Sequence, residues 1–209
     1  MRLYYYYCPS GFSNCYLLGT DLSADESAEE REAIIIDPGM MNSSLLSIIE
    51  DNDYNLKGVL ITHDHTHHIR GLRAIQRVYN AKIYAINPLV GGYRTELVRD
   101  GAVINIGAFK TEVFSVPGHS ADSAVFKVDR LLFTGDALSA GLMGSTASSY
   151  SAATQVSALR RKILSLPGDY TILPGHGPPS SMEAERRFNL DLNSFEELKN
   201  RRPAVRLGF

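Results

Sequence analysis

The histidines are the residues of this sequence with the clearest chemical potential. Four of its six histidines stand within six positions, as His63, His65, His67 and His68. Neutral imidazole binds zinc and similar metal ions well, so a cluster of this density indicates a metal far more strongly than one isolated ring, which would first be interpreted as an ordinary surface or core residue. The cluster therefore predicts a metal site, without requiring that every ring bind the metal.

Three further ligand side chains follow short apolar runs elsewhere in the chain. His119 follows Pro-Gly in "FSVPGHS", His176 follows Pro-Gly in "TILPGHG", and Asp136 follows Thr-Gly in "LLFTGD". Glycine in such turns lets the backbone approach a site closely. The chain thus offers up to seven ligands, more than the four of a tetrahedral zinc site, so two ions fit better. Two ions about 3.5–4 Å apart lower the pKa of a bound water towards ~7, which favours hydrolysis.

The elements that would position these ligands are short strands interrupted by helices. Runs rich in β-branched and aromatic residues predict strands, and apolar residues recurring at threes and fours predict helices. The histidine cluster lies in a loop between a strand and a helix, where functional residues gather. The predicted strands are 2–8, 14–19, 33–37, 58–62, 82–86, 102–106, 111–116, 124–128, 131–135 and 170–175, and the predicted helices are 43–52, 68–80, 151–166 and 180–200.

Composition excludes several classes of protein. The 21 basic and 23 acidic residues are spread along the chain and give a net charge of −2, which argues against a nucleic-acid surface and for small-molecule substrates. The sequence predicts no signal peptide and no membrane span, and therefore a single cytoplasmic domain over 1–209. Its oligomeric state stays open. Cys8 and Cys15 are predicted to be buried free thiols, and the acidic segment 20–32 a solvated hairpin loop.

The ligands and their settings resemble the metallo-β-lactamase superfamily, whose signature T-H-x-H-x-D-H is followed by single His, Asp and His ligands at later strand ends. Thr62 begins the matching run, and Asp37 in "IIIDPG" matches the early aspartate motif of the family. The resemblance implies an α/β fold, an αββα sandwich of two mixed β-sheets with helices on the outer faces. Within the superfamily, "PGHG" followed by "EAERRFN" is most similar to the glyoxalase II-like thioesterases.

The resemblance also implies a role for each ligand. Metal one would be held by three histidines, metal two by three others, and Asp136 would bridge two divalent ions, zinc first, with iron or manganese as alternatives. A hydroxide between the ions would attack an ester-like carbonyl, and Asp136 and His67 are the residues expected to take part in catalysis. Asp37 and Asp64 would lie behind the ligands, and Asp64 would either orient a ligand histidine or simply be solvated. The ligands of metal one are His63, His65 and His119, and those of metal two are His67, His68 and His176.

The match to the family breaks at His67, which stands where the signature has aspartate. Three outcomes are open. His67 replaces the aspartate as a ligand of the second metal, which is the preferred interpretation since imidazole binds such ions well. Alternatively, only metal one is bound tightly and His67 lies behind it or shuttles protons. In the third outcome the site is inactive, which the other matching ligands argue against.

The predicted function is hydrolysis of a thioester, ester or lactone. Because the sequence ends at Phe209, it leaves no room for the helical domain that binds glutathione in full-length glyoxalase II, so a glutathione thioester is not a safe expectation. One alternative is a mono-iron oxygenase resembling the persulfide dioxygenases of the superfamily. The other is a phosphodiesterase, against which the slight excess of acidic residues counts. Tyr93, Arg94 and Tyr150 are candidate substrate contacts on neighbouring loops, although ordinary surface positions explain them equally well.

Overall fold

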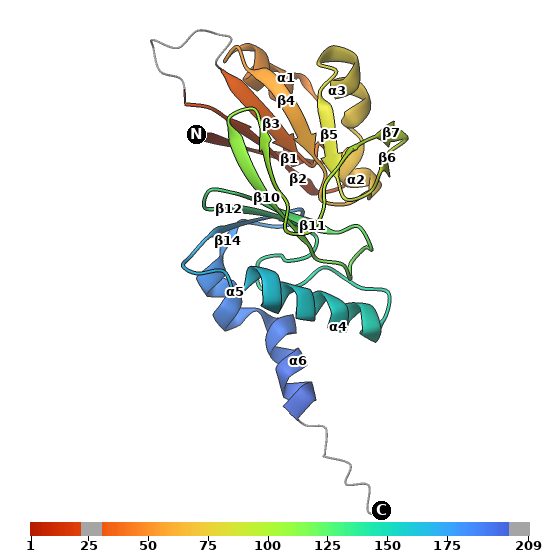
Figure 1. Cartoon of the computed structure of the whole chain (residues 1–209), viewed down its shortest axis with the longest axis vertical. Coiled ribbons are helices and arrows are strands. Elements are labelled where there is room, and N and C mark those ends of the chain that lie inside the picture. Colours follow the sequence, from red (N-terminus) through yellow and green to blue (C-terminus); the bar gives the residue numbers. More distant parts are fainter. Residues whose placement is uncertain (22–30, 201–209) are drawn as a thin grey trace, which may run out of the picture.

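A computed structural model describes residues 1–21 and 31–200 of the chain, with the side chains of 196–200 left out. Two six-stranded sheets pack face to face, and helices cover the outer face of each (Figure 1). This arrangement is the predicted αββα sandwich, so the fold class expected from the sequence is confirmed. Most of the acidic segment 20–32 and the last nine residues of the predicted single domain lie outside the described residues.

The first sheet begins with an antiparallel meander and continues as a parallel sheet. β1 to β3 pair antiparallel, and β3, β4, β5 and β8 pair parallel. β2 and β3 in its middle are buried along almost their whole length, as expected for strands covered on both faces. In spatial order the strands are β1 (Arg2–Cys8), β2 (Ser13–Gly19), β3 (Glu32–Ile36), β4 (Asn55–Leu60), β5 (Lys82–Ala85) and β8 (Glu96–Leu97).

The second sheet is antiparallel except where β12 and β13 run parallel. The connection between those two strands carries a helix, as a parallel crossover requires. A separate hairpin of β6 (Leu89–Val90) and β7 (Tyr93–Arg94) lies outside both sheets. In spatial order the second sheet contains β14 (Ser180–Ser181), β13 (Thr171–Pro174), β12 (Leu131–Gly135), β11 (Ala124–Val128), β10 (Phe109–Ser115) and β9 (Val103–Ile106).

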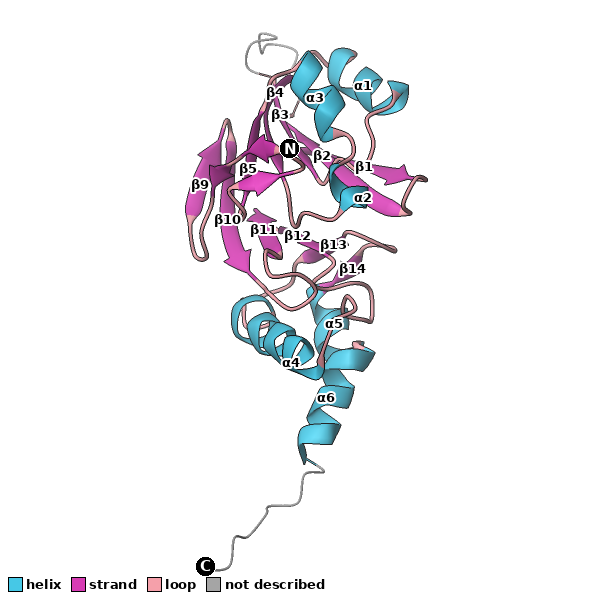
Figure 2. Cartoon of the chain, turned by 90° about the vertical axis from the view of Figure 1, so that its right-hand side faces the viewer, coloured by secondary structure: helices cyan, strands magenta, loops and turns pink. Residues whose placement is uncertain are grey.

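The helices form the two outer layers (Figure 2). Those beside the first sheet are α1 (Ser43–Glu50), α2 (Thr66–Ile69) and α3 (Leu72–Val78), and those beside the second are α4 (Ser149–Ala158), α5 (Met182–Phe188) and α6 (Leu190–Asn200).

Two of the predicted helices are divided. The helix predicted over 68–80 breaks near Gly71, whose N–H donates to the Pro38 carbonyl and whose position leaves no room for a Cβ beside that oxygen. The helix predicted over 180–200 breaks at Asn189, which has extended backbone and accepts a hydrogen bond from the Leu192 N–H.

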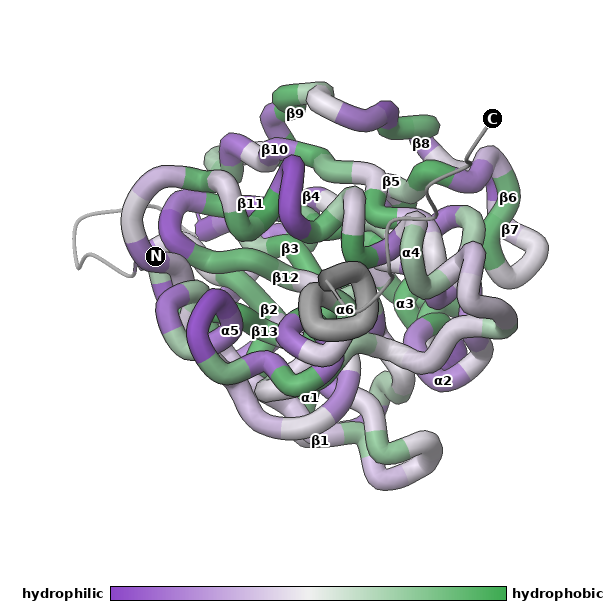
Figure 3. The backbone as a smooth tube through the Cα atoms, turned by 90° about the horizontal axis from the view of Figure 1, so that it is seen from below, coloured by the Kyte–Doolittle hydropathy of each residue, from purple (hydrophilic) through white to green (hydrophobic). Residues whose placement is uncertain are grey.

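Three apolar clusters fill the spaces between the layers. The middle cluster, which includes Tyr16, Phe126 and Phe133, lies between the two sheets, and the other two lie beneath the outer helices. Figure 3 shows the apolar strands running through the centre of the molecule. Cys8 and Cys15 are buried and unpaired, as the sequence predicts. This core forms a rigid frame from which loops project at the strand ends.

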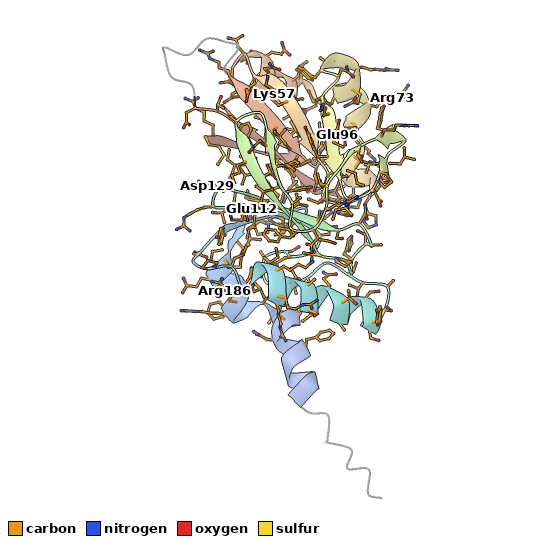
Figure 4. The ribbon with its side chains drawn as sticks, viewed as in Figure 1. Lys57, Arg73, Glu96, Glu112, Asp129 and Arg186 are labelled. Atoms are coloured by element: carbon orange, nitrogen blue, oxygen red, sulfur yellow. The ribbon has the colours of Figure 1, made fainter. Side chains whose placement is uncertain are left out.

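The surface carries charges of both signs. Glu96, Asp129 and Arg186, which Figure 4 labels, are exposed and come from different layers. Among the described residues, no helix combines the length and apolarity that crossing a membrane requires.

Candidate metal centre

Four loops, one from the first sheet and three from the second, meet at one end of the sandwich. The segment after β4 leads into α2 and carries the histidine cluster, and the others follow β10, β12 and β13. Backbone hydrogen bonds join the sheets at this end, since the Ala124 N–H donates to the Thr62 carbonyl at 2.8 Å and the Asn14 N–H donates to the Gly175 carbonyl at 2.8 Å. Loops widely separated in sequence are therefore held against one another by the main chain.

The carboxylate of Asp136 lies at the centre of these loops, with only 8% of the residue exposed. Both of its oxygens face imidazole nitrogens. Oδ1 lies 3.4 Å from His68 Nε2, while Oδ2 lies 3.4 Å from His119 Nε2, 3.6 Å from His176 Nε2, 3.8 Å from His63 Nε2 and 3.9 Å from His67 Nε2. A carboxylate in this position has the geometry needed to bridge two ions.

Three nitrogens form a first ligand set beside Asp136. His65 Nδ1 lies 2.9 Å from His63 Nε2 and 3.0 Å from His119 Nε2. The ligand atoms of these three histidines and Asp136 all lie within 4.8 Å of one another. The far nitrogen of His119 donates to the Ser145 carbonyl at 2.8 Å, so the proton is on Nδ1 and the lone pair of Nε2 faces the set.

The same assignment follows for His63. The Thr62 hydroxyl donates to Asp37 Oδ2 at 2.6 Å and therefore accepts from His63 Nδ1, which is 3.1 Å away. His63 Nε2 is thus left with its lone pair directed at the ligand set. The orientation of this ring depends on a chain of buried polar groups that begins at Asp37.

A second group of ligand atoms lies on the other side of Asp136. His67 and His68 join His63 and Asp136 in a set whose atoms lie within 4.8 Å of one another. His176 lies outside that set, but its Nε2 is as close to Asp136 as the others, and its Nδ1 donates to the Phe12 carbonyl at 2.8 Å. The second group is therefore less compact than the first.

Unpartnered polar atoms test whether these residues suit a metal. His67 Nε2, both nitrogens of His68 and Asp136 Oδ1 are buried without a hydrogen-bond partner, which is unfavourable unless an ion binds them. Two ligands of one tetrahedral zinc ion, each about 2.0–2.1 Å from it, lie about 3.3 Å apart. The spacings around Asp136 fall near that value. The residues therefore fit a centre of divalent ions.

Burial lowers the pKa of three of the six rings, which favours the neutral form that binds a metal. Burial lowers the pKa of His63 to about 3 and, together with the charge on His68, lowers that of His67 to about 4. Against the effect of burial, the carboxylates of Asp136 and Asp37 raise the pKa of His68 to about 9, and His68 in turn holds the pKa of Asp136 below its usual value. At neutral pH His63 and His67 are in the neutral form that binds metal ions.

Glycines allow the loops to close on the ligands. A Cβ on Gly175 would lie 2.4 Å from Asp136 Oδ1 and 2.6 Å from His68 Cε1, and a Cβ on Gly11 would lie 2.6 Å from His67 Cβ. Only glycine fits such approaches. The glycine of "PGHG" that the sequence singled out thus permits contact between the loop after β13 and two candidate ligands.

The two aspartates expected behind the ligands, Asp37 and Asp64, differ in their burial and contacts. Asp37 is buried and accepts from the Thr62 N–H at 2.8 Å, in addition to facing His68 Nδ1 at 3.3 Å. Asp64 is exposed; its Oδ1 accepts from the Gly91 N–H, and its own N–H donates to Asp122. Asp37 therefore contacts the polar groups beside two ligands, whereas Asp64 ties the ligand loop to the β6–β7 hairpin.

The three candidate substrate residues are less closely connected. Tyr93 and Arg94 line a cavity of about 520 Å³ beside α3 and β5 that no candidate ligand lines. Tyr150 begins α4 with 81% of its surface exposed. Their contact with a substrate stays a prediction.

Several positioning residues were missed from the sequence. Ser13, Asn14 and Asp122 hydrogen-bond to ligand-bearing loops. One feature of the sequence could have pointed to Asn14, because asparagine is unfavourable in an apolar strand such as "NCYLLG".

The fold and site define a metal-binding αββα protein. The sequence matches the family model described as the metallo-beta-lactamase superfamily over residues 9–176, and the chain belongs to that family. The resemblance predicted from the ligand motifs is thereby confirmed.

Similar proteins include members of the branch expected from the sequence. Hydroxyacylglutathione hydrolase GloC of Haemophilus influenzae is 28% identical over 207 residues, which cover 87% of this chain and 93% of that protein. An uncharacterized protein of Mycobacterium tuberculosis is 30% identical over 210 residues, covering 84% of this chain and 91% of the other. The crystal structure of ETHE1 from Myxococcus xanthus superimposes with a TM-score of 0.79 at 24% identity, covering 96% of this chain and 92% of that one.

Proposed function

We propose that this protein is a metal-dependent hydrolase of a thioester, ester or lactone that acts through a dinuclear centre. The observation that carries the proposal is the position of Asp136, whose two carboxylate oxygens face five imidazole Nε2 atoms at 3.4–3.9 Å. One tetrahedral ion cannot use so many ligands, whereas two ions sharing a carboxylate use all of them.

The ligands divide between two positions. Two bound ions would lower the pKa of a water molecule and polarise a substrate carbonyl. The chain's own contribution is to present neutral nitrogens in fixed orientations and to hold Asp136 ionised between them. The first position is formed by His63, His65 and His119, and the second by His67, His68 and His176.

His67 is proposed as a ligand in place of the family's aspartate. Its Nε2 is buried, unpartnered and 3.9 Å from Asp136 Oδ2, although about a third of the side chain is exposed. The exposed part of the ring leaves His67 open to a substrate or leaving group, so it is also the candidate for proton transfer in the alternative with one tightly bound ion.

The substrate class is supported by a relative rather than by the site. The Haemophilus influenzae protein, named as a hydroxyacylglutathione hydrolase, matches this chain over nearly its whole length. A chain of this size therefore does not exclude a glutathione thioester, contrary to the expectation from the length of the sequence. We propose thioesters as the first substrates to assay.

Metal content measured by elemental mass spectrometry tests the proposal. Wild type should contain two ions per chain, and His67→Ala should contain close to one. His67→Asp should regain the second ion together with thioester hydrolysis, which is measured as the release of thiol. Thr66→Ala, at the adjacent exposed position, serves as the control and should keep both ions. One ion in all four proteins would refute the dinuclear assignment.

The second candidate function is a mono-iron oxygenase. The first ligand set contains His63, His119 and Asp136, and two histidines with one carboxylate are a typical site for non-haem iron that activates oxygen. The distinguishing result is a single iron per chain, unaffected by His67→Ala, with oxygen consumption in the presence of a persulfide and no thiol release from thioesters.

A further inference from the structure

The tip of the β1–β2 hairpin, residues 9–14, lies against two of the candidate ligands. Its backbone is unusual, because Phe12 has a φ of +57° and Gly11 a φ of +128°. This conformation directs the Phe12 carbonyl to His176 Nδ1 and leaves the Phe12 ring 71% exposed. A non-glycine residue in the left-handed region indicates a conformation held by its surroundings, and here the carbonyl orients a ligand.

Asn14 secures the loop that carries His176 from both sides. Its Nδ2 donates to the Pro174 carbonyl at 2.9 Å and to the Gly177 carbonyl at 2.8 Å, so the amide spans the turn around the ligand. Its Oδ1 accepts from the Tyr5 hydroxyl at 2.8 Å. Asn14 is completely buried, and this arrangement satisfies both amide donors.

The same hairpin also holds His67. The Ser13 hydroxyl donates to the His67 carbonyl at 2.7 Å, and Gly11 lies directly against His67 Cβ. Gly39 closes the other side, where a Cβ would lie 2.2 Å from that carbonyl oxygen. His67 and His176, whose side chains are 31% and 34% exposed, are therefore both positioned by residues of the hairpin.

The first ligand set is held by different segments. The Ser145 carbonyl orients His119, and Asp122 accepts from the Asp64 N–H between His63 and His65. Among the described residues, no hydrogen bond joins residues 9–14 to a histidine of this first set. The two ligand sets share Asp136 and His63, and Asp37 supports a ligand of each, whereas the hairpin contacts histidines of the second set alone among the described residues.

We propose that Asn14 is a positioning residue for His176, and that the β1–β2 hairpin selectively supports the second metal position through His67 and His176. This inference rests on the proposed dinuclear function and extends it by assigning the second position its own support. Loss of the Asn14 donors would free the turn around His176 while leaving the first set intact. Outer partners of metal ligands commonly change affinity by about 10- to 100-fold.

A graded chelator titration with elemental analysis tests this assignment. Asn14→Ala and the equally sized Asn14→Asp should each lose one ion at chelator concentrations about 10- to 100-fold lower than wild type, and should retain the other ion as tightly as wild type. Asn42→Ala is the control, because this asparagine caps α1 and should lower thermal stability without selective metal loss. Parallel loss of both ions from the Asn14 variants would overturn the proposal.

A second readout needs no metal and separates this inference from the proposed function. Long-range ¹H–¹⁵N spectra of metal-free wild type should show His176 with its proton on Nδ1, as donation to the Phe12 carbonyl requires. In Asn14→Ala, His176 should show mixed tautomers, whereas His119 should stay unchanged. This result would support the positioning role even if wild type bound a single ion, and an unchanged His176 would refute it.

Discussion

At the scale of single residues, Asp37 connects the core to the ligands. Its carboxylate accepts from the Thr62 backbone and hydroxyl and faces His68 Nδ1. A buried carboxylate between these groups orients two rings, because the Thr62 hydroxyl in turn accepts from His63. The family motif predicted a role for Asp37, but the chain of contacts that gives it this role required the structure.

Replacing Asp37 with asparagine is expected to destabilise both the fold and the metal site. Asparagine tolerates the left-handed backbone at this position, so the effect would come from the lost charge and acceptor rather than from strain. We expect about 1–3 kcal/mol loss in the free energy of unfolding of the metal-free chain, measured with urea, and about 10- to 100-fold weaker metal binding.

Asp53→Asn provides a matched control for that change. Asp53 also has positive φ, at 53°, but its side chain is 63% exposed and pairs with Arg31 at 3.3 Å. Exposed ion pairs contribute about 0–1 kcal/mol, so this variant should leave stability and metal binding near wild type. Equal effects of the two substitutions would contradict the role of Asp37.

The pKa values of the rings predict an acid-sensitive fold in the absence of metal. His63 and His67 have folded-state pKa values of about 3 and about 4, below the unfolded value of 6.5, so unfolding takes up protons below pH 6.5. The pKa of His68 is raised, so its stabilising contribution is fully present below that pH and does not change. The unfolding temperature of the chelator-treated protein should therefore fall between pH 6 and 4.5.

His67→Ala tests the origin of this acid sensitivity. Removing one of the three rings with a lowered pKa should reduce the number of protons taken up on unfolding and flatten the decline between pH 6 and 4.5. An unchanged slope would mean that other groups cause the loss of stability.

At the scale of elements, hydrophobic patterning was sufficient to predict the strands that carry the site. Runs such as "AIIID" and "LLFTG" are β-branched or apolar, and both became strands close to the predicted bounds. The candidate ligands His119, Asp136 and His176 were singled out because each follows such a run in a glycine-containing turn, and the other four because they cluster after one. The two-residue strands β6, β7, β8 and β14 were not predicted, since two residues carry no periodicity.

The helix breaks could not be predicted, because they depend on contacts with distant segments. Gly71 ends the first part of the predicted helix by donating to Pro38, a partner 33 positions earlier in the chain. The role of Asn14 was not predicted for the same reason, since its partners Pro174 and Gly177 lie at the end of β13 and in the loop that follows it, in the other half of the sandwich. Local propensity contains no information about such pairings.

The loop after β13 offers an element-scale test with two neighbouring glycines. Gly175→Ala should displace Asp136 and His68, because the added Cβ would lie 2.4 and 2.6 Å from their atoms. Gly177→Ala meets no atom within 4 Å but must accept a φ of +79°, which costs roughly 1–2 kcal/mol. Elemental analysis should find metal lost in Gly175→Ala and retained in Gly177→Ala, whereas metal retained in both would contradict the close packing.

At the scale of the whole molecule, the metal centre lies where the two sheets meet. Its ligands come from loops of both sheets, and the main chains of those sheets hydrogen-bond to each other at Thr62 and Asn14. Without metal, this junction contains buried nitrogens and a carboxylate oxygen that have no hydrogen-bond partner. Bound ions would therefore stabilise the packing of one sheet on the other as well as take part in catalysis.

Metal removal is thus expected to lower the unfolding temperature of the entire fold. An ion at a free concentration about 100 times its dissociation constant contributes about 2.7 kcal/mol, which for a chain of this size corresponds to about 5–11 °C per ion. Calorimetry with and without excess chelator measures the shift, and chelator saturated with zinc controls for direct effects of the reagent. An unchanged unfolding temperature after verified loss of metal would show that the sheets pack independently of the centre, because a ligand that binds only the folded state must raise its stability.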